Sequence, residues 1–240
     1  PTLTTQSATP RPNPSPTDTA IRTRLPRWLP DGKRIVAITD MGGEESFVIL
    51  DATGREDAVV LEGLDIGRPD DVAVNPKKDQ VVFSNHRYEI HFLDLETREL
   101  KRIDRGLSLP IYGMTWSPDG EWVAYSISIS LQRIGLKLWN AASGENRLLT
   151  DPVLRDIRPS FDPQGKYLYF LSYRQFDPVY DSLQFDLGFP YGMRPYLITL
   201  QKDLPSPFNP RLVETQADKD QNGEKDKDEK KEEAPIQIDL

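Results

Sequence analysis

The sequence contains no cysteine and only two histidines. Without thiols it can form neither a disulfide nor a thiolate metal site. Cysteine usage therefore does not indicate whether the protein resides in an oxidising or a reducing compartment. It also lacks a run of about 18 apolar residues, so we expect no helix that crosses a membrane. Nucleophile-elbow, His-Glu-x-x-His, phosphate-loop and dinucleotide-binding motifs are absent as well. We therefore expect no catalytic residue, no cofactor and no metal site in this chain.

Basic charge is also scarce. The chain carries 30 Lys and Arg against 38 Asp and Glu, for a net charge of −8. The run from Glu214 to Glu233 has nine acids and five bases, so it contributes −4 of that total. The remaining body is mildly acidic and shows no basic stripe. A nucleic-acid partner would require such a stripe, and we expect none.

Both ends of the chain lack apolar periodicity. Residues 1–20 are rich in Pro, Ser and Thr, and residues 214–234 are almost entirely charged or polar. Neither segment can bury enough surface to offset the entropy of ordering it. We interpret the first as a disordered or excerpted segment, the second as a charged flexible linker, and 21–213 as the folded body. Residues 235–240 indicate the start of another strand or domain. Because the first residue is Pro1, we expect a processed chain or an excerpt of a longer one.

The linker contains one pattern that resembles a calcium loop. Asp218–Glu229 has oxygen-bearing side chains at positions 1, 3, 5 and 12 and Gly223 at position 6. Lys225, however, takes a position that is usually apolar, and the flanks show no helical amphipathicity. Acidic low-complexity runs match such patterns by chance, which favours a solvated linker.

A turn motif recurs four times in the body. The copies are Leu29–Lys33, Asn75–Asp79, Ser117–Glu121 and Asp162–Lys166, and their prolines are spaced 46, 42 and 45 residues apart. A second marker follows each turn and ends at Asp51, Asp94, Asn140 and Gln201. The first two intervals are 43 and 46 residues and the last is 61, so the fourth copy carries an insertion of about 16 residues. Self-similarity at this period is typical of a propeller or a solenoid.

Each copy holds four short runs rich in β-branched or aromatic residues, too short for helices. Pro presets φ and Gly tolerates positive φ in the turns between them. The sequence thus predicts an all-β fold: a β-propeller with four four-stranded blades, part of a larger six- or seven-bladed one. The blades would span about 24–65, 66–107, 108–151 and 152–213. A sandwich of four unrelated hairpin pairs is the alternative, but it does not explain the matched turns.

Strand direction alternates within a blade, so loops between second and third strands should emerge opposite the Pro-Asp-Gly turns. Such loops often carry function on a propeller. They hold Asn85, His86, Arg87 and Arg133. His86 could contact a ligand or a neighbouring domain, although a plain surface histidine is the simpler interpretation. His91 lies in a strand run and is interpreted as structural.

The insertion belongs to the same face and is rich in apolar residues. Its candidate channel or interface residues are Arg174, Phe176, Asp177, Tyr180, Asp181, Phe185, Phe189, Tyr191 and Arg194. A loop of this composition is not simply solvated. We expect it to pack on a partner, on another domain or over a channel mouth. Packing within its own blade is the alternative.

The repeats resemble a known family. Arg27–Ile35 and Trp116–Gly120 are similar to the TolB and tricorn class of propeller repeats. The fourth copy, through Tyr167–Ser172, Phe176–Asp181 and Arg194–Phe208, resembles the second propeller of bacterial tricorn-type proteases. The resemblance covers roughly 24–240.

This resemblance implies a large cytoplasmic serine peptidase that trims oligopeptides and assembles as a homo-oligomer. Its serine nucleophile, with histidine and further Ser and Glu partners, would lie outside this chain, and no family catalytic motif matches a residue here. The propeller would be non-catalytic. It would pack against the remaining domains of the parent protease and guide or gate oligopeptide substrates. A stand-alone TolB-like propeller that binds a protein partner is the alternative, periplasmic if a signal peptide precedes this chain. A third and less favoured alternative is an enzyme whose active site lies in this propeller.

Overall fold

The computed structural model describes residues 21–175, 177–183, 186–188, 192–208 and 238. Within them every regular element is a β-strand. The first sheet contains β1 (Thr23–Trp28), β2 (Arg34–Thr39), β3 (Ser46–Asp51) and β4 (Val59–Leu61), and the second contains β5 (Pro69–Val74), β6 (Gln80–Asn85), β7 (Glu89–Asp94) and β8 (Leu100–Arg105). The third contains β9 (Met114–Trp116), β10 (Trp122–Ser128), β11 (Ile134–Asn140) and β12 (Asn146–Leu148). The fourth contains β13 (Asp156–Phe161), β14 (Tyr167–Ser172) and β17 (Arg194–Thr199).

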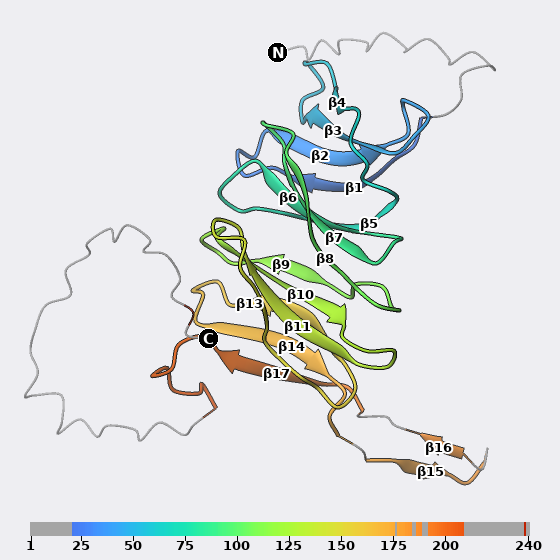
Figure 1. The fold of residues 1–240 in the computed structure, drawn as a ribbon, viewed down its shortest axis with the longest axis vertical. Coiled ribbons are helices and arrows are strands. Elements are labelled where there is room, and N and C mark those ends of the chain that lie inside the picture. Colours follow the sequence, from blue (N-terminus) through green and yellow to red (C-terminus); the bar gives the residue numbers. More distant parts are fainter. Residues whose placement is uncertain (1–20, 176, 184–185, 189–191, 209–237, 239–240) are drawn as a thin grey trace, which may run out of the picture.

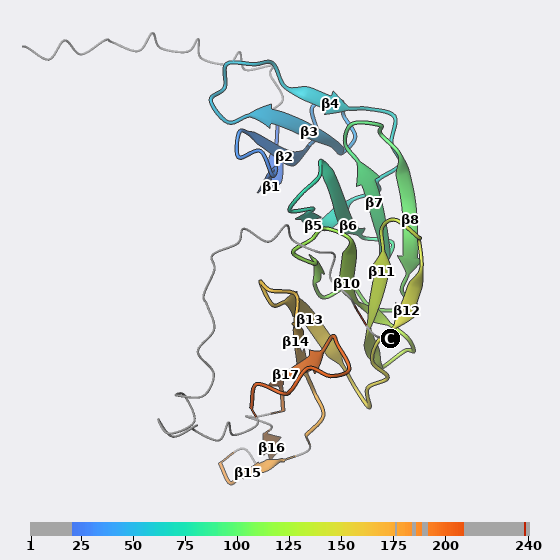
Figure 2. The ribbon, with the colours of Figure 1, turned by 90° about the vertical axis from the view of Figure 1, so that its left-hand side faces the viewer.

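The four sheets are successive blades of a propeller. Each is antiparallel with its strands in chain order. The sheets stack along the molecule and fan out along an arc, with β1, β5 and β13 on its concave side and β4, β8 and β12 on its convex side (Figures 1 and 2). This confirms the predicted all-β propeller fold. The fourth blade shows three strands in the described part of the chain.

The core lies between the blades. Val36 and Phe47 of the first blade pack against Phe83 of the second, and the two phenyl rings meet edge to face at 5.1 Å. Two further clusters follow, one around Trp116 and Trp139 and one around the last two blades. Because the inner blades are covered on both faces, their central strands are apolar along most of their length rather than alternating.

The four recurring turns join the first and second strands of each blade, as the sequence predicts. In the first turn the Gly32 amide donates to the Leu29 carbonyl, and Gly32 adopts a φ of 65°. The Asp31 carboxylate accepts hydrogen bonds from the backbone amides of Lys33 and Arg34. These bonds, with the Arg34 guanidinium, lower the pKa of Asp31 to about 2. The motif is therefore a preformed turn in which each residue type has a structural task.

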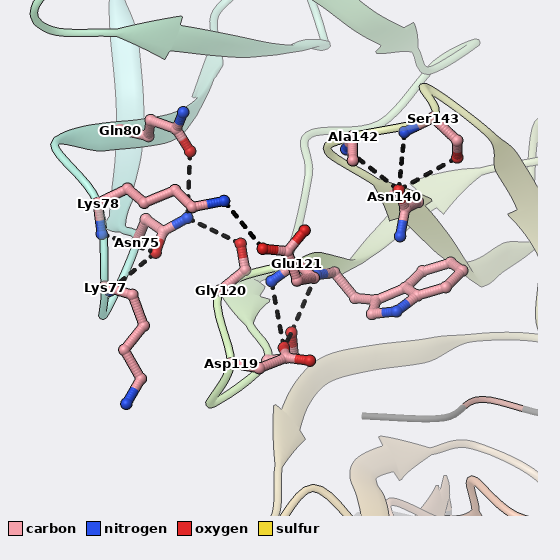
Figure 3. A network of polar contacts seen from close by, with 12 residues as sticks. Asn75, Lys77, Lys78, Gln80, Asp119, Gly120, Glu121, Asn140, Ala142 and Ser143 are labelled. Atoms are coloured by element: carbon pink, nitrogen blue, oxygen red, sulfur yellow. Dashed lines mark hydrogen bonds and ion pairs between the residues drawn. The ribbon is translucent and has the colours of Figure 1, made fainter. Parts of the chain in front are cut away.

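Polar contacts also join one turn to the next (Figure 3). Asn75 Nδ2 donates to the Gly120 carbonyl at 2.9 Å, and Lys78 Nζ lies 2.8 Å from Glu121 Oε1. One blade earlier, Arg34 pairs with Asp79 at 2.5 Å. These contacts repeat the period of the sequence and hold neighbouring blades in register.

The insertion of the fourth blade is not only a loop. It contains a two-stranded hairpin of β15 (Val179–Asp181) and β16 (Asp186–Gly188), which projects from the end of the stack (Figure 1). Three-residue strands bordered by acids give too weak an alternation signal to be recognised in sequence.

Candidate functional site

The face opposite the recurring turns carries the loops between the second and third strands of each blade. Sequence reasoning placed thirteen candidate residues on it, nine of them in the insertion. The structure describes nine of the thirteen. Phe176, Phe185, Phe189 and Tyr191 lie outside the described residues, as does the calcium-like pattern Asp218–Glu229.

A cavity of about 700 Å³ opens on this face between the first two blades. Its walls combine acids with bases: Glu44, Glu45, Asp65, Arg68 and Arg87. Arg87 forms a two-pronged pair with the Asp65 carboxylate, at 2.7 and 2.9 Å. These hydrogen bonds raise the pKa of the guanidinium and lower that of the carboxyl. The cavity is thus polar and its Arg87 charge is already compensated.

Asn85 and His86 hold the loop in place. Asn85 is buried, and its Oδ1 accepts from the amides of Arg87 and Glu89 at 3.0 and 3.2 Å. His86 is exposed, but its Nδ1 accepts from the Arg68 amide at 3.0 Å. Both side chains therefore shape the β6–β7 loop, which is a structural task.

A buried ionisable pair lies behind this loop. His91 Nε2 is 3.5 Å from Glu89 Oε2, and Arg102 Nη1 is 3.2 Å from Glu89 Oε1. Burial lowers the pKa of His91 below its ordinary value, although the Glu89 carboxylate opposes that change. Burial also acts to raise the pKa of Glu89, but hydrogen bonds from Asn85 and Arg102 outweigh it, so that pKa is lowered. His91 is internal, in agreement with its structural interpretation.

The two remaining arginines of these loops pair with carboxylates that differ in their burial. Arg133 pairs with the exposed Asp151 at 2.8 Å. Arg174 Nη2 lies 2.7 Å from Asp156, whose side chain is 0% exposed. The Arg174 guanidinium also stacks on the rings of Phe170 and Tyr196 at 5.5 and 5.4 Å. Arg174 therefore anchors the root of the insertion to the blade.

The hairpin beyond this anchor presents apolar side chains to solvent. The exposed fractions are 59% for Tyr180, 85% for Leu183 and 50% for Leu187. Asp177 is exposed, and the Asp181 carboxylate accepts from the Leu183 amide at 2.8 Å. Arg194 begins β17 at the other root of the insertion. Tyr180 and Leu187 are cross-strand partners and so lie on one face of the hairpin.

A second set of accessible residues was missed by sequence reasoning. The innermost strands, which border the concave side (Figure 2), and the chain just before β9 contain exposed residues. They include Trp28, Asp70, Tyr112, Arg158 and Ser160. A signal did exist, because these residues lie within about ten positions before the recurring turns, where the innermost strand of each blade must run.

The described ranges hold neither a cluster of metal-ligating side chains nor a membrane-spanning helix. No group of three or more His, Cys, Asp or Glu side chains is placed to hold a metal ion there. No helix in that part of the chain is long and apolar enough to cross a membrane.

Comparison with known proteins gives a consistent result. Residues 12–240 match the family model described as the tricorn protease second beta propeller domain. The chain is 36% identical to tricorn protease homolog 1 of Streptomyces coelicolor, over 80% of this chain and 18% of that protein. It is 35% identical to a tricorn-like protease C-terminal subunit of Sulfurisphaera tokodaii, over 83% of this chain and 22% of that protein. The chain thus spans about a fifth of the length of these relatives.

The fold itself has a solved counterpart. A crystal structure of the tricorn protease superposes with a TM-score of 0.70 at 24% identity, covering 82% of this chain and 19% of that one. At this identity the match establishes the shared propeller fold.

Proposed function

Because this chain belongs to the tricorn protease second β-propeller family, we propose that it is a non-catalytic part of a larger serine peptidase. In this role the blades guide oligopeptides along the concave side and provide a surface on which the remaining domains pack. The family match favours this role over a stand-alone TolB-like module. By the same family likeness, the parent protein would be a cytoplasmic homo-oligomer.

The observation that carries the proposal is the concave wall. The strands that border it hold an exposed aromatic ring at Trp28, an exposed acid at Asp70 and an exposed base at Arg158. Such a mixed surface offers contacts to many peptides without a single apolar patch that would retain them. A wall of this kind suits passage better than tight binding of one ligand.

The wall is also held rigidly. Arg27 Nε donates to the Val72 carbonyl at 3.0 Å, and the Arg158 amide donates to the Tyr112 carbonyl at 2.8 Å. Trp116 Nε1 donates to the Ala73 carbonyl at 3.1 Å. Each bond joins the inner part of one blade to the next, so the blades support one another along the concave side.

The loop face supports a packing role. Arg87, Arg133 and Arg174 are all engaged in ion pairs within the chain. Nothing in their geometry activates a nucleophile or positions a general base. What this face offers outward is the apolar hairpin and the polar cavity between the first two blades. Both suit contact with a neighbouring domain or subunit.

The test uses the complete peptidase and two substrate lengths. Asp70→Lys reverses a charge on the concave wall, and Asp57→Lys makes the same change at an exposed site between β3 and β4. We expect Asp70→Lys to change kcat/KM for oligopeptides of ten or more residues several-fold, while a short chromogenic substrate is affected much less. Asp57→Lys should leave both rates unchanged. Equal effects on long and short substrates, or no effect of Asp70→Lys, would overturn the guiding role.

A further inference from the structure

Each innermost strand has one strand partner in the described ranges: β1 pairs with β2, β5 with β6, β9 with β10, and β13 with β14. These strands border the concave side (Figure 2). Each of them ends at a recurring turn, so it runs from one face of the blades to the other. A peptide that crosses between the faces would therefore lie alongside them. A strand edge of this kind is a template for pairing with an added strand.

The three longer innermost strands share an irregularity, a register shift of one residue beside a proline. The shifts lie between Arg24 and Arg27, between Pro69 and Asp71, and between Ile157 and Ser160. Pro26, Pro69 and Pro159 lie in these segments. Proline has no N–H to donate, and a bulge breaks the regular spacing of an edge. The second and third strands of the first three blades contain no proline, so the feature belongs to the edge position.

The register shifts divide these edges into short stretches. The longest stretch lies in β5 after its shift. The Asn75 amide donates to a β6 carbonyl, and alternate residues of an antiparallel strand bond to the partner strand. Val72 and Val74 therefore turn their backbone groups toward the other edge. The same reasoning leaves only Trp28 in β1 and Phe161 in β13 beyond their shifts.

Arg27 covers this stretch of β5. Its Nε donates to the Val72 carbonyl at 3.0 Å, and its Nη2 lies 3.2 Å from the Asp71 carboxylate. Val72 as a whole is 3% exposed. Arg24 acts in the same way before the shift, where its Nη1 donates to the Pro69 carbonyl at 2.6 Å. A buried carbonyl that already accepts from a guanidinium is not available to the amide of a passing peptide.

We propose that the innermost strands are built to resist pairing with an extended peptide, through their proline bulges and through Arg27 at the Val72 carbonyl. The inference rests on the proposed function for the route that the peptide takes. Main-chain pairing would hold a peptide through hydrogen bonds that do not depend on its sequence. A route that serves many peptides must therefore exclude such pairing, and side-chain contacts alone let them move on.

The test uses the complete peptidase and a cleavage-resistant, valine-rich peptide. The same peptide with an N-methyl group on each central residue is the matched probe, because it cannot donate main-chain hydrogen bonds. Arg27→Ala should uncover the Val72 carbonyl and raise the affinity for the plain peptide several-fold, while the affinity for the N-methylated peptide stays unchanged. Arg22→Ala, which removes the same charge just before β1, should change neither affinity. The ratio of variant to wild type cancels binding elsewhere in the enzyme.

A second measurement needs no variant. Photoreactive forms of the two peptides should label the innermost strands of the wild-type protein at similar rates. This comparison decides alone if thermal unfolding shows that Arg27→Ala does not fold. A several-fold preference of wild-type labelling for the plain peptide, or no gain in affinity in a folded Arg27→Ala, would overturn the inference. Labelling by neither peptide would instead contradict the proposed route, and the affinities of Arg27→Ala would still decide whether its edge resists pairing.

Discussion

Asn75 Nδ2 donates a hydrogen bond of 2.9 Å to the carbonyl of Gly120, across the gap between the second and third blades (Figure 3). The two residues occupy the recurring turns of adjacent repeats and are 45 positions apart. Asn75 is fully buried, so its amide depends on this partner and on Gln80. The repeat thus encodes contacts between blades as well as the turn within each blade.

Gly120→Ala should therefore destabilise the chain strongly. A Cβ at this position would lie 2.3 Å from Asn75 Oδ1, and the φ of 75° is unfavourable for any other residue. We expect a loss of about 3 kcal/mol in the free energy of unfolding, from backbone strain plus overpacking. Gly54→Ala is the matched control, with a φ of 65° and open space around the Cβ, and should cost about 1 kcal/mol. Equal losses in urea unfolding would show that the close approach of the turns is unimportant.

The anchor of the insertion should respond asymmetrically to substitution. Arg174→Met leaves the buried Asp156 carboxylate without its cation and should cost about 3 kcal/mol. Asp156→Asn leaves a guanidinium that can reach water and should cost less. Arg133→Met, at an exposed pair, should cost under about 1 kcal/mol. Thermal unfolding of the three variants measures this order, and an Arg133 loss as large as that of Arg174 would contradict it.

Stability should fall in mildly acidic solution because of His91. The unfolded chain takes up a proton on this histidine near pH 6.5, whereas burial lowers the pKa in the folded state. The unfolded state therefore binds more protons just below pH 6.5, and the stabilisation present above that pH is lost as pH falls. The slope should approach about 1.4 kcal/mol per pH unit at most.

Urea midpoints between pH 5 and 8 would measure this dependence. His91→Gln should remove the component that His91 contributes, and His86→Gln should retain it. If the urea midpoint of His91→Gln depended on pH as it does in the wild type, His91 would not be the source of that dependence. The Glu89 carboxyl, whose pKa is also lowered, should add a further loss only below about pH 4.5, where the unfolded chain takes up its proton.

The hairpin should matter for assembly rather than for folding of the blades. Two-stranded hairpins are marginal alone in water, and this one exposes Tyr180 and Leu187 on one face. In the complete protein, Tyr180→Ser with Leu187→Ser should weaken association with a neighbouring domain or subunit by at least about tenfold, as expected for burial of two apolar side chains.

Sedimentation of the complete protein reads out that association. Val59→Ser with Leu148→Ser, at exposed positions on the outer strands β4 and β12, is the matched control. Wild-type assembly in the hairpin variant would mean that these side chains contact no partner.

The repeat architecture could be predicted from the sequence because its turns require particular residue types at fixed positions. Pro, Asp and Gly at fixed offsets define the turn before β2, and the apolar runs after each turn became β2, β6, β10 and β14. The position of Arg87 in the loop after β6 could be predicted for the same reason, whereas Asn85, also expected in that loop, is the last residue of β6.

The residues that these side chains contact could not be predicted from the sequence. That Arg174 would meet a buried Asp156, or Asn75 the carbonyl of Gly120, depends on how adjacent blades pack, which no local pattern encodes. The hairpin in the insertion escaped because its strands are three residues long. The exposed residues of the innermost strands were not predicted, because exposed functional residues were expected in loops and not in strands.

The proposed function requires that oligopeptides pass along the concave side of these blades. An oligopeptide that carries a photoreactive phenylalanine analogue, cross-linked to the complete peptidase and mapped by mass spectrometry, tests it most directly. We expect adducts on the innermost strands, near Trp28, Asp70 and Arg158, that an excess of unlabelled peptide suppresses. Specific adducts confined to the outer strands β4, β8 and β12, or none on these four blades, would contradict it.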